Sequence, residues 1–515
     1  MTLKNKVIIK NTLFLYFRMI LILVVSLYSS RVVLEQLGVE DFGIYHVVAG
    51  VISLLTFVNG ALSTATQRFI CYELGKTNSS KDRLEGIFTS SFTIHLAIGV
   101  IFLIVGLSIG VWVIREFLTI PTVRLDTALL VFYMSLVTVF FNLISIPYIA
   151  NIISFERMSA FAYISIADAI LKLCSVLLLS IISGDKLLYY AVFISLSSTL
   201  VFLCYVLYNK VNLGNTKFKL SWNKEFSKKL VSYIGWNFYG NIAAVVSNYG
   251  VNILLNITFG TVVNAARAIA MQVNSAVFGF VSSLQTSFAP QIIKSYSGND
   301  SNYVRSLIFS GAKLSFFLLL FISTPILAQT DYVLKLWLGS VPDNTEIFVK
   351  LVIIDSLVIS LSGVIMTTFQ ATGKIKLYQV VVGTVILLNL PVSYLMLNLG
   401  GTASIVYYVA ISISIIALIL RLTLLYKLEP ELIKGFVSNV ILRVTLVSIL
   451  SFSINLYISS NLNEDILGLF SGCITSVIVN ITVIYLIGID GNEKAFVRSF
   501  FKSKFSKAKG RTSEL

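Results

Sequence analysis

Long apolar segments alternate with short polar breaks along nearly the whole chain. The hydrophobic residues form continuous runs, which is typical of transmembrane helices. The first run is long and is followed by a second, so we interpret it as a spanning helix and not as a cleaved signal peptide. Each predicted helix could cross roughly 30 Å of hydrocarbon: 11–34, 42–66, 87–113, 122–148, 158–182, 186–208, 230–256, 262–288, 304–328, 346–369, 376–398, 402–426, 437–459 and 465–489.

The pattern therefore predicts an all-α polytopic membrane protein with about 14 transmembrane helices. The breaks near 182–187 and 398–402 are so short that the helices on either side almost merge. Composition agrees with this prediction. Of 515 residues, 57% are hydrophobic and 12% are charged, and the mean hydropathy is +0.88. Soluble domains carry about twice that charged fraction.

The net charge of +15 could suggest nucleic-acid binding, but its distribution favours a membrane topology. With the N-terminus in the cytoplasm, the expected inner segments carry most of the basic residues and the outer ones very few, as the positive-inside rule requires. The inner residues are Arg68, Lys76, Lys81, Arg83, Arg157, Lys210, Lys217, Lys219, Lys224, Lys228, Lys229, Lys294, Arg305, Lys374, Lys376, Arg421, Lys427, Lys434, Arg443 and those of the tail from Lys494 to Arg511. The outer ones are Arg115, Arg124, Lys186 and Lys335, with Lys350 just inside a span.

A weak internal repeat appears when the chain is shifted by 222 residues. Gly38 then falls on Gly260, and the first two predicted helices overlay 230–256 and 262–288 without a gap. Because six spans separate the copies, both run in the same direction. We expect an N-terminal six-helix lobe (1–208), a Lys-rich cytoplasmic link (209–229), a second lobe (230–428), an additional helix pair (429–489) and a basic cytoplasmic tail (490–515). Transporters built from parallel lobes rock around a central site.

Nothing in the sequence predicts a built-in enzyme or cofactor. No P-loop, GxSxG or HExxH motif occurs, and the connections are too short for a soluble catalytic domain. The four cysteines are scattered and the two histidines stand apart, so we predict no disulfide framework and no metal site. These features favour a secondary transporter without an ATPase.

Seven charged residues interrupt the apolar runs: Arg18, Arg31, Asp168, Lys172, Arg267, Lys313 and Asp355. Charges within membrane helices usually face protein or a water-filled cavity. Arg18 and Arg31 lie thirteen residues apart on one helix, which separates them by ~140° around its axis and ~20 Å along it. Both cannot point into one narrow cavity, and either could instead extend to the lipid headgroups.

Asp168 and Lys172 are spaced i,i+4, so they can neutralise each other on one helix. A structural ion pair is the first interpretation, and an ion-coupling role is the alternative. Lys313 could line the cavity or reach the cytoplasmic face. Asp355 has no evident local partner and is a second candidate for ion coupling.

Arg267 is the leading candidate for substrate binding. It shares a helix stripe with Asn274 and Gln285, and the preceding helix carries an amide stripe at Asn237, Asn241, Asn248, Asn252 and Asn256. Hydrogen bonding between helices would explain such amides. We favour the alternative, a hydrophilic cavity wall suited to sugar hydroxyl groups.

Four stretches together resemble the Wzx-type polysaccharide flippases of the MOP exporter superfamily, which also contains MATE drug exporters and MurJ lipid II flippases. They are SRVVLEQLGVEDFGIYHVVAGVISLLTFVNGALSTATQRFICYELGK (30–76), FGTVVNAARAIAMQVNSAVFGF (259–280), LKLWLGSVPDNTEIF (334–348) and FQATGKIKLYQVVVGTVILLNLPVSYLML (369–397). The resemblance implies translocation of an undecaprenyl-pyrophosphate-linked oligosaccharide across the bacterial inner membrane, for O-antigen, capsule or exopolysaccharide synthesis. It also implies partnership with a polymerase and other glycan-assembly proteins.

The resemblance further implies alternating access through a cationic lumen. Arg31 and Arg267 match that expectation, with Arg18, Lys172 and Lys313 as weaker support. Two alternatives stay open: a MATE-like small-molecule exporter and a membrane-embedded glycan polymerase or ligase. The acidic break 38–45 is expected to be an outer turn beside the gate, with the chemistry deeper in the neighbouring helices.

Overall fold

The computed structural model describes residues 3–56, 58–116, 118, 120–214, 224–459, 466–491 and 493–495, and all regular structure within them is helical. The predicted all-α class is therefore confirmed. Most of the predicted tail (492 and 496–515) and the central part of the predicted link (215–223) lie outside the described residues. The first half contains α1 (Leu3–Thr56), α2 (Val58–Gly75), α3 (Lys81–Val105), η1 (Gly106–Gly110), α4 (Val111–Glu116), η2 (Thr122–Arg124), α5 (Leu125–Ser154), α6 (Met158–Leu178) and α7 (Lys186–Asn212).

The second half contains more helices than the first. It contains α8 (Lys224–Phe259), α9 (Thr261–Ser297), α10 (Ser301–Ala328), α11 (Thr330–Leu338), α12 (Thr345–Ser360), α13 (Gly363–Thr372), α14 (Lys376–Leu387), α15 (Asn389–Asn398), α16 (Ile405–Leu428), α17 (Pro430–Phe436), η3 (Val437–Ile441), α18 (Leu442–Ser459), α19 (Ile466–Val483) and η4 (Ile484–Gly488). α11 occupies part of a segment that the sequence predicts to be a loop.

Two glycines bend the chain at equivalent places. Gly38 interrupts α1 with φ 77° and ψ 169°, and Gly260 separates α8 from α9 with φ 81° and ψ −168°. These left-handed φ values favour glycine because it has no Cβ. The two positions are 222 residues apart, so the backbone geometry repeats with the period found in the sequence.

Twelve helical stretches of the described residues are long and apolar enough to cross a membrane. Two of the 14 predicted spans are absent from these twelve: 42–66, which is divided between α1 and α2 where the described residues break at position 57, and 262–288, the more polar helix α9. Both nearly merged pairs are separate helices. Asp185 caps the start of α7, and residues 399–404 connect α15 to α16.

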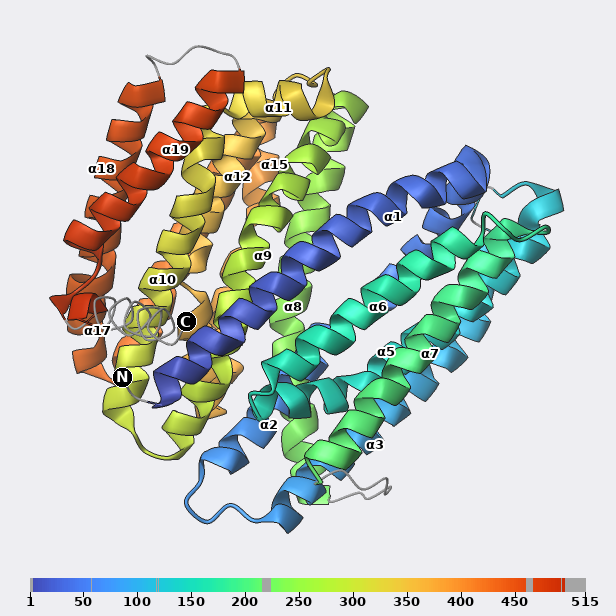
Figure 1. Cartoon of the computed structure of the whole chain (residues 1–515), viewed down its shortest axis with the longest axis horizontal. Helices are drawn as coiled ribbons and strands as arrows, with labels where there is room; N and C mark the ends of the chain where they lie inside the picture. The colour runs from blue at the N-terminus through green and yellow to red at the C-terminus, as the bar shows by residue number, and fades with distance from the viewer. Residues whose placement is uncertain are drawn as a thin grey trace, which may run out of the picture.

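The helices form two lobes that lean apart toward one end (Figure 1). We call α1–α7 the N-lobe and α8–α16 the C-lobe. α1 and α2 pack against α9, and α2 also packs against α8, where the lobes meet. The C-terminal helices α18 and α19 pack against α10, on the outer side of the C-lobe. The end that carries the N-terminus and the α2–α3 connection, at the bottom of Figure 1, is called the basic end below.

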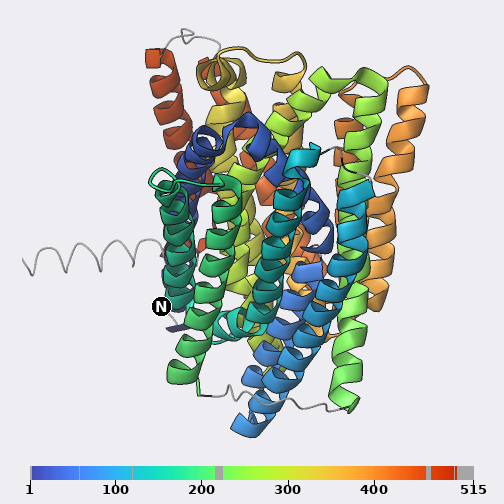
Figure 2. The same cartoon turned by 90° about the vertical axis from the view of Figure 1, so that its right-hand side faces the viewer.

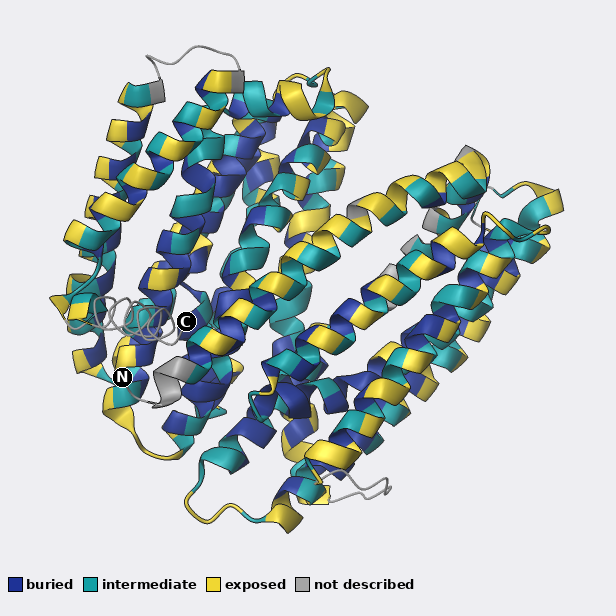
Figure 3. Cartoon of the chain, viewed as in Figure 1, coloured by how far each residue is buried: buried dark blue, intermediate teal, exposed yellow. Residues whose placement is uncertain are grey.

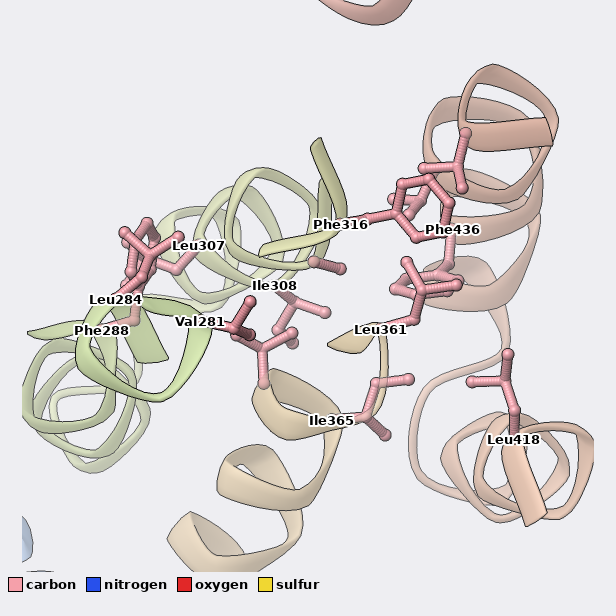
Figure 4. Packing of buried hydrophobic residues seen from close by; sticks show 14 of the residues in the cluster. Val281, Leu284, Phe288, Leu307, Ile308, Phe316, Leu361, Ile365, Leu418 and Phe436 are labelled. Atoms are coloured by element: carbon pink, nitrogen blue, oxygen red, sulfur yellow. The ribbon is translucent and has the colours of Figure 1, made fainter. Parts of the chain in front are cut away.

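Buried residues concentrate inside each lobe, while exposed residues follow the outer helix surfaces (Figure 3). In the C-lobe, Phe288, Ile308 and Phe316 belong to a large core that continues to Phe436 on α17 (Figure 4). A separate core around Phe132 and Leu143 supports the N-lobe. The long helices of the N-lobe run side by side in the perpendicular view (Figure 2). Each lobe thus has a packed interior, and the N-lobe core also includes Leu230 and Tyr233 of α8.

Candidate functional site at the lobe interface

A small polar space lies between the lobes, and we call it the central pocket. Its volume is about 270 Å³, and both lobes line it. The N-lobe contributes Leu15, Arg18, Ser63, Gln67, Ile149, Ile153 and Phe161, and the C-lobe contributes Ser282, Ser283 and Thr286. One cation, one amide and four hydroxyl groups therefore meet here, and the lining contains no carboxylate.

Arg18 gives the central pocket its charge. Leu15, one turn earlier on α1, is fully packed and fixes that face of the helix toward α5 and α6. The guanidinium lies over the Phe161 ring, 4.4 Å from its centroid. Arg18 Nε and Gln67 Nε2 are buried and have no hydrogen-bond partner among the described residues. Two buried donors of this kind are suited to an anionic or hydroxyl-rich ligand.

A second space lies inside the N-lobe, farther along α1 and α6. It has a volume of about 350 Å³, and Ser26, Ser29, Asp168 and Lys172 are among its lining residues. Lys172 Nζ donates to Asp168 Oδ2 at 2.8 Å, which is the ion pair that their spacing predicts. The positive charge of Lys172 thus compensates the only carboxylate that lines this space.

Arg267 lies within the C-lobe and does not line the central pocket. Its Nη2 donates to Asn248 Oδ1 at 2.7 Å and to the Asn248 carbonyl oxygen at 3.2 Å. Its guanidinium also lies 5.7 Å from the centroid of the Tyr407 ring. These contacts hold α8, α9 and α16 together, so Arg267 has a structural role beyond any contact with substrate.

Several of the predicted amides on the two stripes form bonds between helices. Asn237 Oδ1 accepts from Gln379 at 2.9 Å, and Asn274 Oδ1 accepts from Ser356 at 2.6 Å. Gln285 donates to the Ser360 carbonyl oxygen at 3.0 Å. Asn241 lies beside Gly60 of the N-lobe, and a Cβ on that glycine would be 3.2 Å from its Nδ2. None of these amides, nor Asn252, lines the central pocket.

The remaining candidates are dispersed. Arg31 is on the exposed surface and pairs with Glu35 at 2.9 Å. Lys313 is fully buried, and its Nζ contacts Glu493 at 2.6 Å and Asp490 at 3.5 Å, beyond the last spanning helix. Asp355 lies on α12 beside Ser414, with Oδ1 buried and unbonded. The described residues contain no group of His, Cys, Asp and Glu that could hold a metal ion.

The basic end holds functional candidates that the sequence analysis did not select. Glu156 of the N-lobe accepts from Lys294 and Gln291 of the C-lobe. Ser297 donates to the carbonyl oxygen of Tyr72, again across the lobes. At Gly75 the backbones meet so closely that a Cβ would lie 2.2 Å from the Lys294 carbonyl oxygen.

Arg68 completes these contacts. It is buried, and its Nε and Nη2 donate to the carbonyl oxygens of Gln370 and Ala371 at 3.2 and 3.3 Å. Those oxygens lie at the C-terminal end of α13, where carbonyl groups lack partners within the helix and the helix dipole is negative. The lobes are thus joined at the basic end by several polar contacts.

Comparison with known proteins gives a likeness at the level of structure. The chain matches no protein-family model and no curated protein sequence. It is similar to the crystal structure of a mutant MATE protein, with a TM-score of 0.73 and 12% identity over 84% of this chain and 100% of the other. The chain has the MATE fold.

Two further structures extend this likeness. One is an outward-facing multidrug resistance MATE family transporter of the MOP superfamily, with a TM-score of 0.72 and 13% identity over 84% of this chain and 97% of the other. The other is a MOP superfamily transporter from Pyrococcus furiosus, whose title reports a binding pocket of reverse polarity. Its TM-score is 0.69, with 12% identity over 84% of this chain and 99% of the other. The MATE fold places this chain among multi-pass membrane proteins.

Proposed function

We propose that this protein is a flippase that moves an undecaprenyl-pyrophosphate-linked oligosaccharide across the bacterial inner membrane by alternating access. Arg18 in the central pocket is the observation that carries the proposal. A guanidinium pairs well with phosphate oxygens, and the nearby hydroxyl and amide groups suit sugars. Because both lobes line this pocket, a rocking motion would expose it alternately to the two sides.

The charge distribution supports an orientation with the basic end in the cytoplasm. The contacts of Glu156 and Arg68 would then close the cytoplasmic side, while the lobes lean apart toward the periplasm. Substrate loading requires these contacts to break. A secondary transport mechanism, driven by an ion gradient or the membrane potential, fits a chain that lacks ATP-binding motifs. Asp168 and Asp355 remain the candidates for coupling.

A MATE-like small-molecule exporter is the second candidate function, because the fold is equally suited to it. Asp168 is the observation that favours it, since a carboxylate in the N-lobe space could bind a cation. Lys172 already compensates that charge, and Arg18 would repel a cationic substrate from the central pocket. A polymerase or ligase is disfavoured by the short predicted outer segments.

The test is a leaflet-resolved transport assay of labelled lipid-linked oligosaccharide in proteoliposomes, combined with detection of surface glycan in cells. We expect Arg18→Ala to lower transport by roughly tenfold or more, because a charge-assisted phosphate contact is lost. Arg18→Lys keeps the positive charge but not the bidentate geometry of the guanidinium, so its transport rate should lie between those of the wild type and Arg18→Ala. Arg31→Ala, on the exposed surface of the same helix, is the matched control.

The outcomes separate the two candidate functions. Wild-type transport by Arg18→Ala, with normal insertion, would remove Arg18 from the mechanism. If the unmodified protein exports organic cations but leaves the lipid-linked oligosaccharide in place, the MATE-like alternative is correct.

A further inference from the structure

A second cationic site lies at the basic end, outside the central pocket, and we call it the basic groove. It has a volume of about 680 Å³ and lies where α2, the start of α8 and the connection between α13 and α14 meet. Five cationic side chains line it: Arg68, Lys228, Lys229, Lys374 and Lys376. Glu225 is the one carboxylate in the lining.

The positive charge of the basic groove is largely uncompensated. Glu225 pairs with Lys229 at 2.6 Å. No ion pair of Lys228 or Lys374 occurs among the described residues. Lys376 Nζ lies 4.9 Å from the centroid of the Trp236 ring, a contact that leaves its positive charge without an anionic partner. The groove is therefore suited to an anion.

A helix end adds to this potential. α14 begins at Lys376, and no side chain caps its N-terminus. The first backbone N–H groups of a helix are unpaired and carry the positive end of its dipole, so they attract phosphate groups. This helix end and the surrounding lysines act on the same space.

Aromatic and apolar side chains lie among the cations of the basic groove. Phe69, Tyr233, Trp236 and Ile375 line it. Two helices that are long and apolar enough to cross a membrane begin beside the groove, with Lys224 and Lys376 as their first residues. Trp236 lies 12 residues beyond Lys224, about 18 Å along α8. Because Lys376, the first residue of α14, lies against the Trp236 ring, cations and aromatic rings share one level near the start of a spanning helix, which matches a phosphate headgroup and the adjoining part of a membrane lipid.

We propose that the basic groove binds the phosphate headgroup of an anionic membrane lipid. The lysines and the start of α14 hold the phosphate, and the aromatic wall contacts the glycerol and the upper acyl chains. Arg68 and Phe69 come from the N-lobe and the other lining residues from the C-lobe, so the lipid lies across the lobe boundary. The site does not depend on which substrate the protein transports.

Trp236 provides a direct readout in the full-length protein. In neutral detergent, phosphatidylglycerol with brominated acyl chains should quench its emission saturably, whereas brominated phosphatidylcholine should not. The chain has 4 tryptophans, so the signal from this site is the quenching that disappears in Trp236→Phe. The triple variant Lys228→Gln/Lys374→Gln/Lys376→Gln should weaken binding roughly a hundredfold, because each basic residue contributes about fivefold.

The matched control neutralises three exposed lysines elsewhere at the basic end, in Lys81→Gln/Lys427→Gln/Lys434→Gln. It has the same net charge as the groove variant and should bind almost as well as the wild type. Equal losses in both triple variants would mean general surface attraction and would overturn the proposal, as would equal quenching by phosphatidylcholine. If phosphatidylglycerol gives no saturable quenching, while inorganic phosphate but not chloride at equal ionic strength changes the Trp236 emission, free phosphate is the ligand and a lipid is not.

Discussion

The two ends of the molecule are held by different kinds of contact. At the basic end, polar contacts cross from one lobe to the other: Glu156 pairs with Lys294, and Arg68 donates to the last carbonyl groups of α13. At the Gly38 end, the described ion pairs stay within a lobe. Arg124 bridges Asp41 and Asp185 of the N-lobe, and Lys350 pairs with Glu346 of the C-lobe.

This difference indicates how the lobes can move. Contacts within a lobe preserve its shape, so each lobe can rotate as a rigid body. Contacts between lobes stabilise one arrangement, here the one closed at the basic end. Alternating access would require those contacts to break and reform, whereas the bridge at Arg124 could stay intact throughout.

A covalent cross-link between the lobes at the basic end should have the largest effect on transport. In a cysteine-free background, Glu156→Cys/Lys294→Cys joined by a reducible bifunctional thiol reagent should lose transport completely, because the lobes can no longer separate. Reduction should restore it. The control joins Asp331→Cys to Lys335→Cys, one turn apart on α11, and should transport normally. Full transport by the cross-linked Glu156 and Lys294 pair would show that this end does not open.

Preventing closure should have the next largest effect. A Cβ in Gly75→Ala would lie 2.2 Å from the Lys294 carbonyl oxygen, and backbone at that distance must move. Overpacking of this kind costs about 1–3 kcal/mol, which would lower the ratio of closed to open molecules by roughly fivefold to 150-fold. The measurement is the rate of maleimide labelling of Ser63→Cys in the central pocket, with reagent added from the basic end. This rate should rise in Gly75→Ala.

The control for this prediction is Gly86→Ala on α3, where a new Cβ would have no neighbour within 4 Å. When Gly86→Ala is added to Ser63→Cys, the cysteine should be labelled at the same rate as in Ser63→Cys alone. If Gly75→Ala also labels at the parent rate, the close approach at Gly75 does not limit access.

The sequence predicted the helical class because that class depends on local patterns. Continuous apolar runs indicate membrane helices wherever they occur, and Gly38 and Gly260 have the same backbone geometry at the predicted shift. The spacing of Arg18 and Arg31 also indicated different directions. The structure agrees, with Arg18 in the central pocket and Arg31 on the surface.

The site itself depends on contacts that spacing cannot reveal. Arg267 has its partner Asn248 on the preceding helix, and Lys313 pairs with Glu493, 180 residues later. A helical stripe identifies the face of a side chain but not what that face meets. The carbonyl groups that bind Arg68 have no signature in the side-chain sequence at all.

Removing a single ion pair should have the smallest effect on labelling of Ser63→Cys, and one pair at each end of the molecule can be compared. Glu156→Gln removes a charge from a pair whose side chains are only 12% and 22% exposed. We therefore expect the closed state to lose about 1 kcal/mol, which lowers the ratio of closed to open molecules roughly fivefold. Asp331→Asn breaks an exposed pair within one helix and should leave labelling of Ser63→Cys unchanged. Lys294→Met added to Glu156→Gln should cost little more, because the two residues act on one contact. Equal labelling rates for Glu156→Gln and Asp331→Asn would mean that the ends differ in shape but not in the energy of their ion pairs.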